Sequence, residues 1–156
     1  MNFMNAGNKN RLSLDTNILV YALDKDGGLR HQTSREIVEQ AIFHDCVLTL
    51  QSLGEFYSAV TRKGKMSQTD AEAQIVDWME LFPVARAGPA SLLKAVKAVR
   101  LHRLSFWDAM LWATVREAGG KQLISEDFQN GRELEGVTFV NPFELDDPAR
   151  ILFGKE

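Results

Sequence analysis

Cysteine is nearly absent from this chain, and so are the features that mark membrane and secreted proteins. Cys46 is the only cysteine in 156 residues, so no disulfide can form within the chain and the cytoplasm is the default compartment. No apolar run approaches the ~20 residues that a membrane-spanning helix needs. The N-terminal residues lack the apolar segment of a secretory signal. These absences predict a cytoplasmic protein without a membrane partner.

Several common site motifs are missing as well. The histidines His31, His44 and His102 share no metal-ligand spacing, which argues against a Cys/His zinc site. No serine lies in a Gly-x-Ser-x-Gly context, and no glycine-rich phosphate loop is present. The formal net charge of −3 argues against a protein that coats nucleic acid by bulk electrostatics. It remains compatible with a local basic patch.

Hydrophobic and charged residues occur in the proportions of an ordinary globular domain, 45% and 25%. Short apolar runs alternate with segments of helical spacing, and this alternation predicts an α/β domain with a mainly parallel sheet and helices on both faces. The five expected strands are Leu12–Leu14, Cys46–Leu50, Phe82–Ala85, Gln122–Ile124 and Val137–Val140. The expected helices span residues 18–23, 33–43, 52–63, 67–78, 89–99 and 105–117. Residues 1–11 and 144–156 are predicted to be tails around one domain of residues 12–143.

Four acidic residues stand where the chain turns from a strand into the segment that follows. They are Asp15, Glu55, Asp108 and Asp127. An open α/β sheet would gather them at the carboxyl ends of its strands, where such folds bind their ligands. Carboxylates brought together repel one another, and a hard cation such as Mg²⁺ relieves the repulsion because it prefers oxygen ligands and phosphate-bearing substrates. The pattern therefore predicts metal-assisted phosphodiester chemistry.

Each of these acids also has a purely structural interpretation, which for Asp127 is a turn formed by Ser125, Glu126 and Asp127. Asp15 is a good N-cap for the helix after it. Glu55 follows Ser52, and Asp108 follows Ser105, at the spacing of a capping box.

Other polar residues also leave a choice between two interpretations. Glu126 competes with Asp127 for the fourth acidic position, and Ser125 is either a hydrogen-bond donor to the site or a turn residue. Two basic clusters, residues 62–65 and Arg100 with Arg103, are either solvated faces or phosphate contacts. The second cluster is the favoured substrate contact because it directly precedes the helix that carries Asp108.

Taken in order, four motifs resemble the PIN-domain ribonucleases of the VapC toxin type. The motifs are Asp15 to Asp24 (DTNILVYALD), Gln51 to Phe56 (QSLGEF), Leu104 to Ala109 (LSFWDA) and Leu123 to Gly131 (LISEDFQNG). The resemblance covers residues 12–143 and implies a PIN-like fold with a five-stranded, mainly parallel sheet. It also implies an acidic pocket that holds Mg²⁺ or Mn²⁺.

The resemblance assigns a role to each motif residue. Asp15, Glu55, Asp108 and Asp127 fall on the four acidic positions, which act as catalytic residues and metal ligands. Thr16 and Asn17 fall on supporting polar positions, and Ser125 stands where the family usually has threonine. An RNA substrate, a cognate antitoxin and a homodimer are the implied partners.

The implied activity is metal-dependent endoribonuclease cleavage that inhibits translation and leaves a 5′-phosphate and a 3′-hydroxyl. One alternative is a non-catalytic PIN-like module that binds RNA or protein. The other is a phosphatase with Asp15 as nucleophile. It is disfavoured because such enzymes usually carry a second aspartate two residues on, where this chain has Asn17.

Overall fold

The computed structural model describes residues 10–154. The helices are α1 (Thr16–Leu23), α2 (Leu29–Ala41), α3 (Leu50–Arg62), α4 (Gln68–Leu81), α5 (Pro89–His102), α6 (Phe106–Glu117) and α7 (Pro148–Phe153), with a 3₁₀ helix η1 (Pro142–Glu144). The strands are β1 (Leu12–Leu14), β2 (Leu48–Thr49), β3 (Val84–Ala85), β4 (Gln122–Ile124), β5 (Glu133–Leu134) and β6 (Val137–Val140). Within this part of the chain no helix has the length and apolar character needed to span a membrane.

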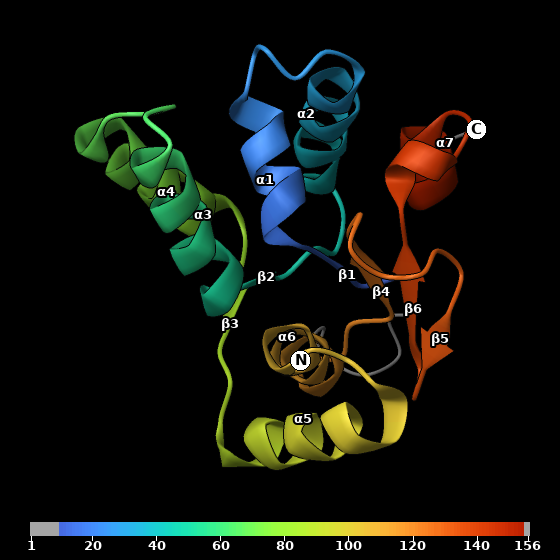
Figure 1. Cartoon of the computed structure of the whole chain (residues 1–156). Coiled ribbons are helices and arrows are strands. Elements are labelled where there is room, and N and C mark those ends of the chain that lie inside the picture. The colour runs from blue at the N-terminus through green and yellow to red at the C-terminus, as the bar shows by residue number, and fades with distance from the viewer. Residues whose placement is uncertain (1–9, 155–156) are drawn as a thin grey trace, which may run out of the picture.

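The sheet is parallel except at one edge (Figure 1). Strands β1, β4 and β6 pair in parallel, and β5 adds an antiparallel edge strand to β6. Strands β2 and β3 form a separate parallel pair, which meets β1 through a single bridge between Leu12 and Cys46. The α/β class is therefore confirmed, and all five expected strands are present. Together with the unexpected edge strand β5 they form a four-stranded and a two-stranded group rather than one continuous sheet, because β2 is only two residues long.

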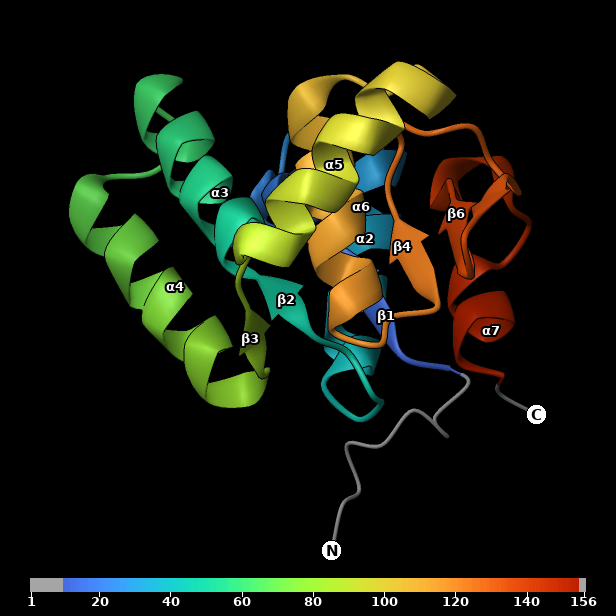
Figure 2. The same cartoon turned by 90° about the horizontal axis from the view of Figure 1, so that it is seen from below.

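Two apolar cores lie on opposite faces of the sheet. Helices α1 and α2 cover one face, whereas α6, with α5 outside it, covers the other (Figures 1 and 2). Successive strand residues enter different cores, since Ile124 packs with α1 and α2 while Leu123 packs with α5 and α6. This alternation explains why the strands are apolar throughout.

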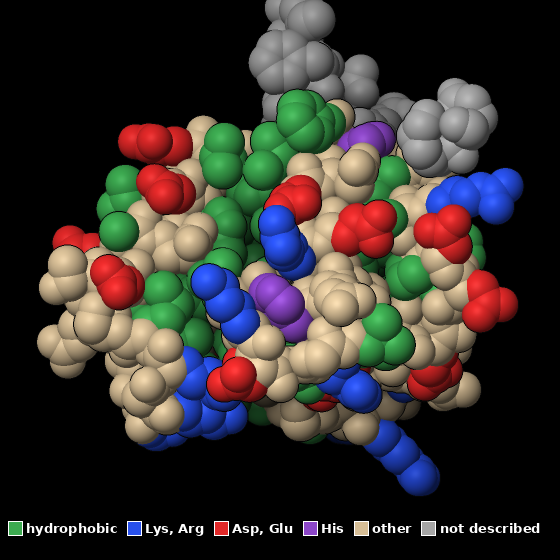
Figure 3. All heavy atoms as spheres, turned by 90° about the horizontal axis from the view of Figure 1, so that it is seen from above, with side chains coloured by type: hydrophobic (Ala, Val, Ile, Leu, Met, Phe, Trp, Pro, Cys, Tyr) green, Lys and Arg blue, Asp and Glu red, His purple; other side chains and the backbone are tan. Residues whose placement is uncertain are grey.

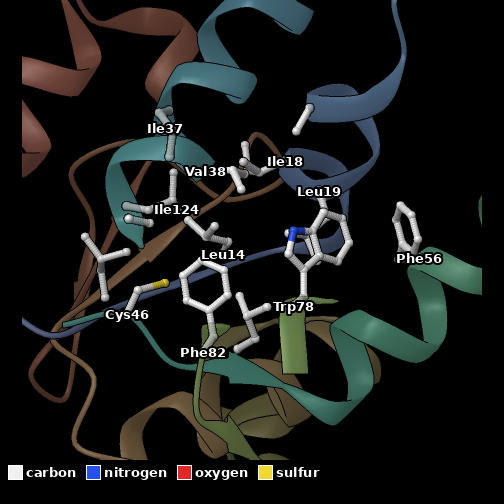
Figure 4. Packing of buried hydrophobic residues seen from close by; sticks show 14 of the residues in the cluster. Leu14, Ile18, Leu19, Ile37, Val38, Cys46, Phe56, Trp78, Phe82 and Ile124 are labelled. Carbon is white, nitrogen blue, oxygen red and sulfur yellow. The ribbon is translucent and has the colours of Figure 1, made fainter. Parts of the chain in front are cut away.

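The larger core is closed by aromatic side chains from the α3–α4 side of the molecule. Trp78 and Phe56 meet edge to face at 4.8 Å, and Phe82 lies near Leu14 and Cys46 (Figure 4). All five of these side chains are buried. Their packing holds the α3–α4 pair against β1 and α1, and thereby sets where α3 stands relative to the end of β1.

Helix α3 begins two residues earlier than expected. Its N-cap is Thr49, whose hydroxyl accepts a hydrogen bond from the Ser52 amide at 3.0 Å. The expected start at Ser52 was wrong, because β2 ends at Thr49 and α3 begins at the next residue. Glu55 consequently lies in the second turn of α3, where it cannot complete a capping box.

Near both ends of the chain, the described residues differ from the predicted tails. Residues 1–9 lie outside the described residues, but Arg11 is buried, with Nε 3.1 Å from Asp45 and Nη1 donating to the Ala118 carbonyl at 2.7 Å. Near the other end, Pro148–Phe153 forms α7, and Phe153 packs against His44 with ring centroids 4.7 Å apart. The C-terminal segment is therefore helical rather than a tail, because it buries apolar side chains against α2.

Candidate active site

The site lies beside β1 at the switch point of the sheet, where the order of the strands changes direction. The connection from β1 leads toward β2 on one side, whereas β4 and β6 lie on the other side of β1. Asp15 directly follows β1, and its amide donates to the Ile124 carbonyl of β4 at 2.9 Å. Open α/β sheets bind ligands at such a switch point, outside the carboxyl ends of the strands.

Asp15 occupies the bottom of this site and is only 5% exposed. Its carboxylate accepts hydrogen bonds from the Thr16 amide and from the Ser125 hydroxyl, both at 2.6 Å. The first of these bonds makes Asp15 the N-cap of α1. The capping interpretation is thus correct, and it does not remove the carboxylate from the site.

Each of the three supporting polar residues, Thr16, Asn17 and Ser125, forms a hydrogen bond with at least one of the acids. The Ser125 hydroxyl holds Asp15, as above, and it also accepts from the Asp127 amide at 3.0 Å. Thr16 Oγ1 donates to Glu55 Oε1 at 3.0 Å, and Asn17 Nδ2 donates to Asp127 Oδ2 at 3.1 Å. The start of α1 therefore orients acids from α3 and from the loop after β4.

Asp108 reaches the site from the first turn of α6. Ser105 caps this helix and accepts from the Asp108 amide at 3.4 Å. Burial raises the pKa of Asp108 above its ordinary value, a hydrogen bond with Ser105 opposes the shift, and the charges of Asp127 and Glu55 add to it. The mutual repulsion indicates that these carboxylates share one electrostatic environment.

Burial is also the main reason why the pKa of Asp15 rises to about 6. Its hydrogen bonds with Ser125 and Thr16 lower the pKa, and the charges of Asp127 and Asp108 raise it. Ionising all the acids is therefore costly in the isolated protein. A cation or a basic side chain in the pocket would relieve that cost.

The choice between the neighbouring acids after β4 is clear from their partners. Glu126 accepts a hydrogen bond from the Tyr21 hydroxyl and pairs with Arg30 at 2.9 Å. Arg30 in turn lies over the Phe143 ring, 4.9 Å from its centroid. Glu126 is thus held away from the other acids, whereas Asp127 joins them.

These groups surround a pocket of about 390 Å³. Its lining consists of Asp15, Thr16, Asn17, Val20, Tyr21, Gln51, Glu55, Ala59, Lys63, Trp107, Asp108, Leu111 and Asp127. All four acids found from the sequence line it, together with Thr16 and Asn17. Arg100 and Arg103 are not in this lining, and the basic residue that the structure brings to the pocket is Lys63 of the first cluster.

A four-residue spacing connects the residues of α3 and its C-cap that line the pocket. Gln51, Glu55, Ala59 and Lys63 follow one another at intervals of four, so one face of the helix and its C-cap runs along the pocket. Gln51 Nε2 donates to the Trp107 carbonyl at 3.0 Å and thereby ties the start of α3 to the start of α6. Counting in fours from Glu55 would have identified Lys63.

The donor set suits a hard cation, although the carboxylates form no ready-made cage. Among residues 10–154, no three His, Cys, Asp or Glu side chains are placed closely enough to hold one ion. Mg²⁺ needs only one or two carboxylates, because waters and substrate phosphates complete its shell. Asn17 Oδ1 adds a buried oxygen that has no hydrogen-bond partner among the described residues. The residues therefore fit a sparsely held Mg²⁺ whose shell is completed by waters and substrate oxygens.

These features define the class of protein: an α/β domain with an acidic pocket at the switch point of its sheet. The PIN domain family model matches residues 12–130, and the chain belongs to this family. A comparison with curated proteins gave no significant match.

Three solved structures share the fold at low sequence identity. VapC20 of Mycobacterium tuberculosis, described as a sarcin-ricin loop cleaving toxin, is 18% identical over 72% of this chain and 86% of its own, with a TM-score of 0.57. A toxin–antitoxin complex from Klebsiella pneumoniae has 18% identity, coverage of 86% and 99%, and a TM-score of 0.61. PAE2754 from Pyrobaculum aerophilum has 17% identity, coverage of 94% and 92%, and a TM-score of 0.60. These matches support the PIN fold.

Proposed function

We propose that this protein is a metal-dependent endoribonuclease of the VapC type, the toxin of a toxin–antitoxin pair that inhibits translation. The observation that carries the proposal is the convergence of Asp15, Glu55, Asp108 and Asp127 on one pocket. Three of these acids are held by a side chain from the start of α1 or the loop after β4. Such orientation positions charge in advance, which is how active sites stabilise transition states.

The toxins among the structural matches support the same activity. VapC20 is a toxin that cleaves the sarcin-ricin loop, which is RNA, and the Klebsiella structure contains a toxin with its antitoxin. We infer an RNA substrate for this chain and a cytoplasmic site of action, where such a substrate is found.

The chemistry follows from the positions of the acids. A bound Mg²⁺, or Mn²⁺, would supply Lewis-acid activation of the phosphate and of a water molecule. Asp15, Asp108 and Asp127 would hold the ion directly or through its bound waters, and the hydrogen bonds of Ser125 and Asn17 keep two of these carboxylates in place. Glu55, held by Thr16, would orient the attacking water. Hydrolysis in this geometry leaves a 5′-phosphate and a 3′-hydroxyl.

A toxin of this kind needs a restraining partner. We infer an antitoxin whose segment crosses the pocket with an arginine, because a guanidinium pairs bidentately with carboxylates and stays charged. We also infer that two copies of the chain associate through apolar helical surfaces. Neither partner is required for the pocket to form, since every lining residue comes from one chain.

Cleavage of total RNA with mapped ends tests the proposal. We expect cleavage in Mg²⁺, none in EDTA, and severe loss in Asp15→Asn and Asp108→Asn proteins that remain folded. Asp77→Asn, an exposed change on α4, is the matched control and should cleave like the parent. RNA that binds the parent but stays intact in Mg²⁺ and in Mn²⁺ would instead identify a non-catalytic binding module. Full activity in chelator would overturn the metal-dependent mechanism.

A further inference from the structure

We propose that Trp107 is the platform on which an unpaired RNA base stacks when its neighbouring phosphate enters the acidic pocket. The inference rests on the proposed nuclease function and deepens it, because it specifies a single-stranded substrate and the side chain that receives it. Four observations carry it: the exposure of Trp107, its place on α6, the hydrogen bond that anchors it and the depth of the pocket.

Trp107 is the exposed member of the three tryptophans. It is 60% exposed, whereas Trp78 and Trp112 are buried in the two cores. A large aromatic side chain in water forgoes the stabilisation that burial would provide. The Phe106 ring meets the indole edge to face at 4.8 Å and leaves most of it accessible. Packing within the chain therefore does not explain a tryptophan at this position.

The indole belongs to the helical face that lines the pocket. Trp107 and Leu111 are one turn apart on α6, and both line the pocket with Asp108. Leu111 is buried and forms part of the floor, so Trp107 stands one turn above it at the rim. A base stacked there would place its own phosphate next to the carboxylate of Asp108.

The platform is anchored to the acids by a hydrogen bond. Gln51 Nε2 donates to the Trp107 carbonyl at 3.0 Å and lies 3.4 Å from Glu55 Oε2. The backbone of Trp107 is thereby held at a defined position relative to Glu55 on α3. A prearranged platform loses little freedom when it binds its ligand, which favours affinity.

The depth of the pocket indicates why the ligand is a single strand. Asp15 lies at the bottom and is nearly inaccessible, so a phosphate must enter the pocket to approach it. A single strand can splay its bases outward as its backbone enters, and such bases stack on aromatic side chains. Lys63 lines the same pocket and supplies a positive charge for the backbone.

Binding to metal-free protein isolates stacking from cleavage. The full chain in EDTA is titrated with labelled single-stranded RNA of about a dozen nucleotides, and anisotropy gives Kd. We expect Trp107→Leu to raise Kd about 5- to 150-fold, the fold-change equivalent to base–aromatic stacking, and Trp107→Phe to raise it less. In the parent, RNA should quench the emission of Trp107, the tryptophan that solvent reaches.

A set of RNAs with one abasic nucleotide each gives the test its specificity. One abasic position should weaken binding to the parent as much as Trp107→Leu does, and that position should have no further effect in the Trp107→Leu protein. A protein weakened only by structural damage would not show this coupling. Phe43→Leu is the matched control, since Phe43 is 81% exposed but precedes the amino end of β2 and does not line the pocket, which lies at the carboxyl ends of the strands.

The outcomes separate this inference from the nuclease proposal. A Trp107→Leu protein that binds RNA like the parent would overturn the platform, even if the parent cleaves RNA. If the Trp107→Leu protein binds RNA like the parent but has a lower mass than the parent in light scattering, Trp107 belongs to a contact between protein chains. That outcome also overturns the platform. Coupled loss of binding in a parent that never cleaves would support the platform and overturn the nuclease.

Discussion

Asp15 has two roles, as the N-cap of α1 and as an acid of the pocket, which the sequence alone presents as alternatives. Its carboxylate caps α1 through the Thr16 amide and simultaneously faces the other acids of the pocket. The fold tolerates this because Ser125 donates a second hydrogen bond to the same carboxylate. A capping position at the end of a central strand is therefore no argument against a functional acid, and the two interpretations are compatible in this fold.

The raised pKa of Asp15 has a definite consequence for stability. In the folded protein its pKa is about 6, against an ordinary value of 3.8. Between these values the folded state binds a proton that the unfolded state has lost, so the free energy of unfolding falls as pH rises through this window. Neutralising the residue removes the penalty, which the shift puts at about 3 kcal/mol.

We therefore expect Asp15→Asn to stabilise the metal-free protein at about pH 7, with the gain fading as pH falls to about 4. Asparagine keeps the capping function, so the helix start should survive. Urea unfolding at several pH values measures the difference. A variant less stable than the parent near neutral pH would mean that the hydrogen bonds of Asp15 outweigh its burial.

Ser125 offers a second prediction for a single residue. Its buried hydroxyl donates to Asp15 and accepts from the Asp127 amide, so Ser125→Ala leaves the buried Asp15 carboxylate and the Asp127 amide without these partners. We expect a loss of about 1–3 kcal/mol in unfolding free energy and lower RNA cleavage. Ser125→Thr retains the hydroxyl and should keep most of both. Ser34→Ala is the control, because the Ser34 hydroxyl is also buried but has no hydrogen-bond partner among the described residues.

Among the elements, α3 shows what local sequence patterns reveal and what they conceal. The four-residue spacing from Gln51 to Lys63 is visible in the sequence, but its meaning depends on which face of the helix turns toward β1. That orientation is set by Phe56 and Trp78 in the larger core, which are distant in sequence from Asp15. Asp15 and Asp127 were predictable from the ends of β1 and β4, whereas Asp108 follows α5 rather than the expected strand and Glu55 lies in the second turn of α3. The basic contact required the tertiary packing.

Lys63 is accordingly the better candidate for a substrate contact. We expect Lys63→Ala to weaken RNA binding similarly for all sequences and to lower the salt dependence by about one phosphate contact. The Arg100→Ala/Arg103→Ala protein is the comparison, and it should change binding less because neither residue lines the pocket. Anisotropy titrations over a range of salt concentrations measure both effects. A larger effect from the arginine pair would place the RNA path along the end of α5 instead.

The elements missed from the sequence have physical explanations. Strand β5 is joined to β6 by Glu135 and Gly136, which both have positive φ, as a tight hairpin turn requires. Glutamate rarely occupies the first of these positions, so the turn signal was weak. The short helix α7 exists because Leu152 and Phe153 find a buried place against α2, a tertiary effect that six residues cannot encode locally.

At the scale of the whole molecule, the net charge is slightly negative, and the face that α1 and α2 form has no large basic patch. Acidic and basic side chains are interspersed over the surface seen from the α1 and α2 side (Figure 3). With a net charge of −3, long-range attraction to RNA is weak. Binding must then depend on local contacts such as those of Lys63 and Trp107. This agrees with the sequence argument that a local patch, rather than bulk charge, would bind nucleic acid.

The outer face of α5 is the best candidate for contact between two copies of the chain. Its inner residues Ala95 and Ala98 pack in the core that α5 shares with α6, whereas Leu92, Leu93 and Val96 are exposed. Apolar side chains grouped on one helix are unfavourable in water and typical of an interface. A matching face on a second copy would cover them in a symmetric, self-complementary dimer.

We expect the parent to have the mass of a dimer in light scattering at micromolar concentration, and Leu93→Glu with Val96→Glu to reduce it to a monomer. Charges placed at the centre of an apolar interface lose their hydration without gaining partners. Leu29→Glu, at an exposed position on α2, is the control and should leave the mass unchanged. None of these α5 residues lines the pocket, so the monomeric variant should still cleave RNA. A parent that stays monomeric would remove the dimer and leave the nuclease proposal unaffected.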